Sequence, residues 1–397
     1  MLASTSRFLA LNRALVASTS TRALGTSSVL LANRAIAYTI NGDPSSVLSA
    51  VSFPDLSPPS PNTANIRFIL SAINPADINV IEGIYPARPV PNETLSRNGL
   101  PTYVAGNEGL AEVVEVGDGV TSLVKGDWVV MTRPQSGTWT SATNVDVHDV
   151  FRLPSSDLTA AQAATITVNP PTAFNMLHDF VKLKEGDWVI QNGANSAVGQ
   201  AVIQIAAAKG LKTINFIRDR DNVESVKAYL KGLGATHVAT YQELADKAFK
   251  SQVKTWTDGS VGSQNILLGL NCVSGKYTTL MARLLGDNAH LVSYGAMSKE
   301  PFSLPTSLFI FKNLTCHGFW QSRWYSQKTA EERAHMMNVL AELTRTGKLQ
   351  SPNHEIVTIA GGMTDQEARD IICTTVARLA GGKYGKKVLL RVEETIN

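Results

Sequence analysis

Cysteine is scarce in this chain. Only Cys272, Cys316 and Cys373 occur among its 397 residues, and they lie far apart. They form neither a C-x-x-C pair nor a metal-binding cluster, and an odd number of scattered cysteines favours free thiols over a disulfide framework. Cys272 and Cys316 lie in apolar, strand-like runs, which predicts that both thiols are buried and unreactive.

Long apolar runs and early acidic residues are also missing. No apolar stretch reaches the length of a membrane span, so we predict that the mature chain has none. The first 42 residues contain no acid, and Arg7, Arg13, Arg22 and Arg34 lie among Ser, Thr, Leu and Ala. This composition is typical of a mitochondrial transit peptide, predicted over residues 1–34, with an untargeted disordered tail as the alternative. Without those arginines the net charge of +3 falls to about −1, which leaves no basic excess for nucleic acid.

What the sequence does contain is a strand, a turn, a helix and a second strand within residues 186–220. The apolar run 188–190 is short, as a buried parallel strand should be. Apolar residues then recur at helical spacing over 198–206, and Gly210 lies where a helix C-cap glycine belongs. Residues 213–217 form the next strand. The free backbone N–H groups at the start of such a helix bind anions, so this unit suits the pyrophosphate of a dinucleotide.

The usual G-x-G-x-x-G fingerprint of such turns is absent. With Gly199 as its last glycine, the first two positions hold Ala194 and Ser196. An ordinary tight turn with small residues for packing is therefore the alternative interpretation.

The end of the second strand indicates which dinucleotide binds. An NAD-binding fold usually places an acidic residue there, about 20 residues after the glycines. Here the strand ends in Arg218, Asp219 and Arg220. Two guanidinium groups suit a ribose 2′-phosphate, because each can bind phosphate oxygens bidentately, so we predict NADPH. Alternatively, the arginines pair with Asp219 and Asp221 on a solvated turn.

The flanking regions predict two domains of an α/β protein. Residues 35 to about 172 contain short β-like runs separated by turn signals, and the segment from 356 to 392 is expected to return to this β-rich domain. From 173 to 346 helices alternate with six strands, which predicts a doubly wound parallel sheet. Asp221 and Glu224 suggest a capping box for a helix that ends near Gly234. A linking helix is expected over 172–180, and a longer one over 331–346.

Several strings carry a family resemblance. NPADIN, GIYP, GNEG, NGANSAVGQAVIQIA, RDR, LNCV, YGAM and GFWQSRW occur in an order that resembles the mitochondrial trans-2-enoyl thioester reductases of the medium-chain dehydrogenase/reductase superfamily. The resemblance implies a six-stranded Rossmann domain at 173–346 and a catalytic GroES-like domain at 35–172 and 347–397. Zinc dehydrogenases of this superfamily bind metal through Cys and His, whereas the matching positions here are Asn74 and Asn107, so no metal is expected.

The resemblance also implies a catalytic tyrosine, matched by Tyr85 in GIYP. Hydride delivery to the β-carbon of an enoyl thioester builds negative charge on the thioester oxygen, and the α-carbon then needs a proton. A phenol with a pKa of about 10 is neutral at pH 7 and can stabilise that enolate. A carboxylate such as Glu82 would repel it. Without the resemblance, Tyr85 would be interpreted as a surface aromatic beside Pro86.

The same residue-by-residue comparison implies a set of NADPH contacts. For Lys386, the neighbouring Lys383 and Lys387 are alternative matches. Trp320 could equally belong to the core or to the wall of the pocket, and His317 is interpreted as a strand histidine. The implied contacts are Asn169, Asn195, Ser196, Ala197, Val198, Arg218, Asp219, Arg220, Tyr294, Gly295, Ala296, Met297, Phe319, Trp320, Gln321 and Lys386.

These features predict an NADPH-dependent reductase of trans-2-enoyl thioesters in mitochondrial fatty acid synthesis. The substrate is carried on acyl carrier protein or coenzyme A, and the resemblance implies a homodimer in the mitochondrial matrix. One alternative is a quinone or enone reductase of the same fold that acts on free small molecules. Another is a nucleotide-binding regulator without turnover, which the presence of Tyr85 in its motif argues against.

Overall fold

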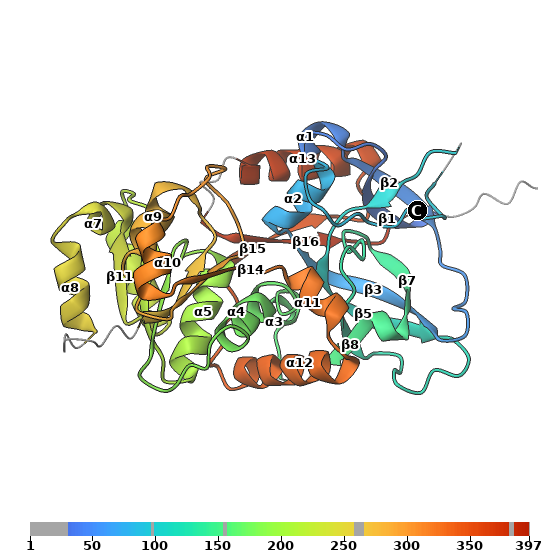
Figure 1. The fold of residues 1–397 in the computed structure, drawn as a ribbon. Helices are drawn as coiled ribbons and strands as arrows, with labels where there is room; N and C mark the ends of the chain where they lie inside the picture. Colours follow the sequence, from blue (N-terminus) through green and yellow to red (C-terminus); the bar gives the residue numbers. More distant parts are fainter. Residues whose placement is uncertain (1–30, 97–98, 154–156, 258–265, 381–384, 397) are drawn as a thin grey trace, which may run out of the picture.

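The computed structural model describes residues 31–96, 99–153, 157–257, 266–380 and 385–396 (Figure 1). Most of the predicted leader lies outside these residues. Its last four residues, however, begin strand β1 (Leu31–Tyr38), which pairs with β2 (Ser49–Pro54). Residues 31–34, the last four of the predicted leader, therefore belong to a strand, and the leader itself stays a prediction.

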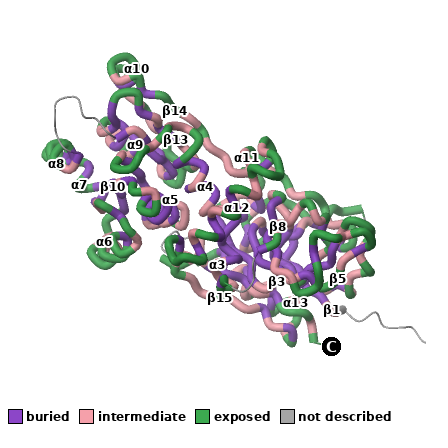
Figure 2. The backbone as a smooth tube through the Cα atoms, turned by 90° about the horizontal axis from the view of Figure 1, so that it is seen from below, coloured by how far each residue is buried: buried purple, intermediate pink, exposed green. Residues whose placement is uncertain are grey.

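A six-stranded parallel sheet occupies the middle of the chain, with the order β11-β10-β9-β12-β13-β14. The predicted doubly wound sheet is confirmed. Apart from the edge strand β14, its strands bury side chains on both faces, because helices cover each face. Figure 2 shows exposed residues of α6 (Val223–Gly232), α8 (Phe249–Trp256) and α10 (Thr306–Lys312) on the outside. The strands are β9 (Trp188–Gln191), β10 (Lys212–Ile217), β11 (His237–Thr240), β12 (Ile266–Asn271), β13 (His290–Ser293) and β14 (Thr315–Gly318).

The other two sheets form the β-rich part of the molecule. The late strand β16 (Lys387–Val392) pairs antiparallel with the early strand β3 (Thr63–Ala72), as the red and blue strands of Figure 1 show. A three-stranded sheet has the order β2-β1-β4, with β4 at Tyr103–Val104. The seven-stranded sheet contains β3 (Thr63–Ala72), β5 (Glu108–Val116), β6 (Trp128–Met131), β7 (Ala142–Asp146), β8 (Val150–Leu153), β15 (His354–Ile359) and β16 (Lys387–Val392).

The helices largely follow the predicted pattern, with two corrections. Helix α4 begins at Asn169, not at residue 172, because prolines are tolerated in a first helical turn. Helix α6 has Asn222 as its N-cap, so the expected capping box at Asp221 is wrong. The helices are α1 (Pro44–Val47), α2 (Pro75–Ile81), α3 (Ala160–Ala163), α4 (Asn169–His178), α5 (Ala197–Ala208), α6 (Val223–Gly232), α7 (Tyr241–Ala245), α8 (Phe249–Trp256), α9 (Gly275–Ala282), α10 (Thr306–Lys312), α11 (Gln321–Gln327), α12 (Ala330–Arg345) and α13 (Asp365–Ala380).

No helix in the described ranges combines the length and the apolar character that crossing a membrane requires.

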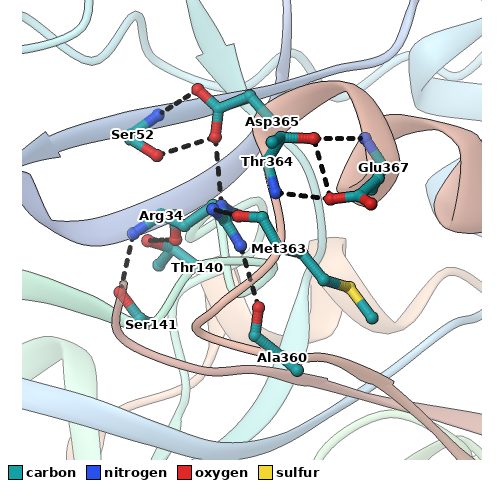
Figure 3. A network of polar contacts seen from close by, with 9 residues as sticks. All are labelled: Arg34, Ser52, Thr140, Ser141, Ala360, Met363, Thr364, Asp365 and Glu367. Carbon is teal, nitrogen blue, oxygen red and sulfur yellow. Dashed lines mark hydrogen bonds and ion pairs between the residues drawn. The ribbon is translucent and has the colours of Figure 1, made fainter. Parts of the chain in front are cut away.

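Arg34 fastens the start of the folded chain to its C-terminal part (Figure 3). Its side chain is 2% exposed, and the guanidinium donates to the Asp365 carboxylate at 3.1 Å and to the carbonyl oxygens of Ala360 and Met363. Asp365 also accepts from the backbone N–H and the hydroxyl of Ser52. Charge-assisted bonds of this kind are stronger than neutral ones, so this network ties β1 and β2 to α13.

Replacing Arg34 with methionine should lower the free energy of unfolding by about 2–3 kcal/mol, because buried carbonyl oxygens lose a charged donor. Urea unfolding followed by circular dichroism measures the change. Arg67 provides a matched control, since its side chain is 47% exposed and its ion pairs span 3.7 and 3.9 Å. Arg67→Met should cost less than about 1 kcal/mol. Equal losses in the two variants would contradict the anchoring role of Arg34.

Candidate functional site

The turn after β9 has the geometry of a dinucleotide-binding turn despite its missing glycines. Ser196 is the N-cap of α5, and its hydroxyl accepts from the Gly199 N–H at 3.1 Å. A Cβ atom at position 199 would lie 2.6 Å from the Ala194 carbonyl oxygen, so the close approach of helix and turn requires glycine there. The predicted contacts Asn195, Ala197 and Val198 are half-buried around the start of this helix, where the backbone favours an anion.

The predicted 2′-phosphate site follows β10 at the carboxyl edge of the same sheet. Arg218 and Asp219 are exposed and Arg220 is half-buried. Asp219 accepts a hydrogen bond from the backbone N–H of Gln242 at 3.3 Å, which orients its carboxylate toward α7. The three residues lie one strand away from the turn at Ser196, because β10 and β9 are neighbours in the sheet.

Further predicted contacts follow β13 and β14 at the carboxyl edge of the six-stranded sheet, which we call the rim. Tyr294 follows β13 and donates its N–H to the Asn271 carbonyl oxygen at 2.9 Å, and Gly295, Ala296 and Met297 continue from it as exposed residues. Phe319 follows β14 and donates its N–H to the Ser293 carbonyl oxygen at 2.9 Å.

Gln321 begins α11 beside Phe319 and carries an unused donor. Its side-chain oxygen accepts from Asn175 at 3.1 Å, but its buried Nε2 atom has no hydrogen-bond partner among the described residues. A buried amide donor without a partner is costly unless a ligand accepts from it. The residues present therefore fit a bound dinucleotide at this rim.

Tyr85 and Trp320 meet where the β-rich part faces the rim. The indole Nε1–H of Trp320 donates to the Tyr85 hydroxyl at 2.7 Å, and the two rings meet edge to face at 5.9 Å between centroids. Because an indole can only donate, the phenol oxygen accepts and its own proton stays available for another group. Burial raises the pKa of Tyr85 above the ordinary value of 10.0, which keeps the phenol neutral.

The loop that carries Tyr85 is fastened to α2. The backbone N–H groups of Ile84 and Tyr85 donate to the Asn79 carbonyl oxygen at 3.0 and 3.1 Å. Gly83 allows this return with a φ of 79°, in a region that other residues rarely adopt. The turn between α2 and Tyr85 therefore presents the aromatic ring to the rim instead of leaving it on the surface beside Pro86.

The positions at which zinc dehydrogenases hold metal contain asparagines with protein partners. The Asn107 side chain accepts from the Gln135 N–H, and the Asn74 side chain contacts Glu108, Asn169 and Lys387. Amide side chains are not ordinary zinc ligands, and the described residues contain no group of three His, Cys, Asp or Glu side chains suited to a metal ion. These residues do not fit a catalytic zinc.

Of the competing lysines, Lys387 reaches the interior. Its ammonium donates to the Asn74 side-chain oxygen, and burial lowers its pKa. Lys386 is exposed at the preceding position. Lys383 lies outside the described residues. Asn169 is 9% exposed and donates to Asn74 at 3.2 Å, so this predicted contact lies beside the Lys387 ammonium.

A groove of about 740 Å³ extends from Trp320 across the β-rich part and is open to solvent. Apolar residues, among them Leu56, Leu95 and Met131, line part of it. Arg88 and Arg323 are among its charged lining residues.

The cysteine and histidine predictions have mixed outcomes. Cys272 is buried as predicted, and burial raises the pKa of its thiol to about 11. Cys316 is exposed, so the prediction of a buried thiol is wrong there. It lies on β14, which is the edge strand of its sheet, and an apolar run alone does not distinguish an edge from an interior strand. His317 lies 2.8 Å from a ring nitrogen of His290 on the neighbouring strand, in agreement with a satisfied strand histidine.

Sequence reasoning missed the network around Glu108. This carboxylate is fully buried and lies between Asn74 and the start of α4. The signal available was the acidic residue in GNEG, directly before the apolar run Gly109 to Ala111, where the strand is buried. Acidic residues are seldom fully buried without partners, so its position called for a specific role.

Several known proteins are similar to this chain. Residues 197–341 match the family model described as zinc-binding dehydrogenase, and residues 60–155 match the alcohol dehydrogenase GroES-like domain. The mitochondrial enoyl-[acyl-carrier-protein] reductase of Yarrowia lipolytica is 42% identical over 326 residues, which cover 82% of this chain and 83% of that protein. The structure of the Etr1p/NADP/crotonyl-CoA complex has a TM-score of 0.84 at 36% identity and covers 91% of this chain and 100% of its own. The mitochondrial 2-enoyl thioester reductase Etr1p/Etr2p heterodimer from Candida tropicalis has a TM-score of 0.83 with the same identity and coverage.

Proposed function

We propose, since the chain belongs to the family of mitochondrial enoyl-[acyl-carrier-protein] reductases, that Tyr85 is the residue that stabilises and protonates the enolate in its reaction. The chain is an NADPH-dependent oxidoreductase of mitochondria that converts trans-2-enoyl thioesters into saturated acyl thioesters. The observation that carries the proposal is the 2.7 Å hydrogen bond from Trp320 to the Tyr85 hydroxyl.

The mechanism uses the phenol as a neutral hydrogen-bond donor. When bound, NADPH supplies the hydride that reaches the β-carbon of the thioester. Tyr85 would then face the thioester oxygen as negative charge develops on it. Its O–H can donate there, because the bond from Trp320 uses a lone pair of the phenol oxygen and leaves the proton free. Directly or through water, Tyr85 delivers a proton to the α-carbon. Trp320 holds the phenol in place and covers one side of it.

The residues proposed to hold NADPH lie along the carboxyl edge of the six-stranded sheet. The N-terminus of α5, with Ser196 as its cap, suits the pyrophosphate. Arg218 and Arg220 suit the 2′-phosphate. The residues from 294 to 297, those from 319 to 321, and Asn169 complete the proposed set, and Trp320 among them contacts Tyr85. The catalytic β-rich domain would comprise 35–172 and 347–397, and the NADPH-binding domain 173–346, a division supported by the pairing of β16 with β3.

One assay tests the proposed function. Purified protein should oxidise NADPH when crotonyl-CoA is added, which is measured by the loss of absorbance of the reduced nicotinamide. A free enone and a quinone serve as comparison substrates at matched concentration. Faster turnover of either free compound would favour the quinone or enone reductase alternative. NADPH binding without turnover of any of the three would favour a regulator.

The carrier of the acyl chain is proposed to approach along the groove beside Trp320. Acyl carrier protein and coenzyme A both hold the thioester on a phosphopantetheine arm, so an anionic phosphate must lie some distance from the reacting carbon. Arg323 lies at the Trp320 end of the groove, with its guanidinium carbon 5.7 Å from the indole centroid, and Arg88 is exposed on the same groove. Their charge suits either carrier, and we propose that acyl carrier protein is among the substrates.

A homodimer is proposed to form at β14, the edge of the six-stranded sheet. Thr315, Cys316 and Gly318 of this strand are exposed, and an exposed edge invites pairing with another chain. The preceding helix α10 adds an apolar patch, in which Ile310 is 66% and Phe311 80% exposed. An edge strand beside such a patch is suited to burial in an interface.

Replacing Phe311 with aspartate should convert the dimer into a monomer, because an interface would have to bury the new charge without a partner. Light scattering coupled to gel filtration gives the mass directly. Ile356 is a matched control, since it is 44% exposed on β15 at the edge of the other large sheet. Ile356→Asp should leave the mass unchanged. A Phe311→Asp protein that remains dimeric, or a wild-type monomer, would contradict the proposed interface.

A further inference from the structure

Glu108 accepts hydrogen bonds from two different parts of the chain. Its side chain is fully buried at the start of β5. One carboxylate oxygen accepts from the backbone N–H groups of Thr167 and Val168, each at 2.9 Å. The other oxygen accepts from the side-chain amide of Asn74 at 2.9 Å. An ionised carboxylate, which can only accept, satisfies all three donors.

Asn74 continues this chain of hydrogen bonds to the predicted cofactor contact. Its side-chain oxygen accepts from the Asn169 amide at 3.2 Å and from the Lys387 ammonium. Its backbone N–H donates to the buried Asp77 carboxylate at 2.7 Å. The Lys387 ammonium lies near both carboxylates and interacts favourably with each. Burial raises the pKa of Asp77 to about 7 and also raises the pKa of Glu108.

The two ends of the network lead to the two halves of the site. Asn74 immediately precedes α2, and the Tyr85 loop is hydrogen-bonded to Asn79 on that helix. Residues 167 and 168 immediately precede α4, whose first residue is Asn169. A single carboxylate therefore joins the helix that leads to the proposed acid to the helix that begins with a proposed NADPH contact.

We infer that Glu108 is a positioning residue, which holds α2 and the start of α4 in the relative placement that brings Tyr85 and bound NADPH to the same substrate. This inference rests on the proposed function of Tyr85 and Asn169. Glu108 itself touches neither reacting group. Its role is to fix Asn74 and the backbone before Asn169. A wrong hydrogen-bonding pattern at Glu108 therefore displaces both α2 and the start of α4.

The hydrogen-bonding pattern provides a reciprocal test. In Glu108→Gln the new amide faces the amide of Asn74, so two donors oppose each other. In Asn74→Asp two carboxylate oxygens oppose each other at the 2.9 Å spacing of the present bond. In the double variant, the amide introduced at position 108 can donate to one oxygen of the carboxylate introduced at position 74 and still accept from residues 167 and 168. The other oxygen of that new carboxylate accepts from Asn169 and Lys387. The double variant thus keeps both the net charge and every bond.

Each single variant should lower kcat/KM for NADPH in the crotonyl-CoA reaction by roughly 10- to 100-fold, the scale expected when a supporting group shifts an aligned site. The double variant should recover most of that loss. The KM for NADPH should rise in the single variants, because Asn169 is displaced. Simple loss of folded protein would instead lower Vmax and leave the KM unchanged. A double variant as slow as the single ones, or a Glu108→Gln protein with wild-type kinetics, would overturn the inference.

Fluorescence titration with NADPH separates this result from failure of the proposed function. A wild-type protein that binds NADPH but does not reduce crotonyl-CoA would sink the proposed function alone. The positioning role would then still predict weaker NADPH binding in both single variants and recovery in the double variant. Equal affinity in all four proteins would sink the positioning role, whatever the wild-type activity.

Discussion

Replacing Tyr85 with phenylalanine should reduce the turnover of crotonyl-CoA by about 100-fold or more, the usual scale for loss of a general acid. Phenylalanine fills the same space against Trp320 but cannot donate a hydrogen bond to the enolate. The indole of Trp320, which now donates to the Tyr85 hydroxyl at 2.7 Å, would also lose its acceptor. The measurement is kcat under saturating NADPH, with the NADPH affinity of the variant determined separately by fluorescence titration.

Two comparisons make this result specific. Tyr103 is another half-buried tyrosine of the β-rich part, and its ring packs 5.5 Å from that of Tyr38. Tyr103→Phe should keep near-normal turnover. The Tyr85 variant should still bind NADPH, because the proposed cofactor contacts are unchanged. A Tyr85→Phe enzyme with a near-normal rate would refute the assignment of the acid.

The same assignment predicts the response to alkaline pH. Burial raises the pKa of Tyr85 above its ordinary value of 10.0. The active form is the protonated phenol, which is present below this pKa and is lost as the pH rises through it. The Tyr85-dependent part of the rate should therefore persist up to about pH 10, the ordinary pKa of a phenol. If this part is lost in a step centred well below that pH, a different group carries the proton.

Much of the nucleotide-binding part could be predicted from the sequence, because local patterns determine it. Short apolar runs and helical periodicity predicted the six parallel strands, and the carboxyl ends of parallel strands necessarily share one edge. That rule alone places the residues after β13 beside those after β14. The capping of α6 was less predictable, because Asp221 and Asn222 are neighbours and either residue type is a good cap.

Contacts between distant residues could not be predicted in this way. Trp320 lies 235 positions from Tyr85, and the choice between a core and a pocket residue depended on how the two parts meet. Arg34 was assigned to the leader by its composition, although its guanidinium is buried against a segment more than 300 residues later. Glu108 similarly joins elements that only the folded chain brings together.

Replacing both Arg218 and Arg220 with alanine should lower kcat/KM for NADPH by about 100-fold or more, and should change kcat/KM for NADH much less. A charge-assisted hydrogen bond contributes roughly 1.5–3 kcal/mol, and each guanidinium can form two such bonds with the 2′-phosphate. NADH has no such phosphate, so it loses only general contacts with the turn. The ratio of the two values, measured with crotonyl-CoA, reports cofactor preference independently of enzyme concentration.

The control for these arginines is Arg283, an exposed residue at the C-terminal end of α9. That helix starts after the carboxyl end of β12 and runs toward the opposite edge of the sheet, so Arg283→Ala should leave the preference for NADPH intact. Equal effects of the double substitution on NADPH and NADH would mean that the arginines stabilise the turn, for example through Asp219 or Asp221, and do not bind the 2′-phosphate. A selective loss with NADPH would mean that at least one of the two guanidinium groups binds the 2′-phosphate.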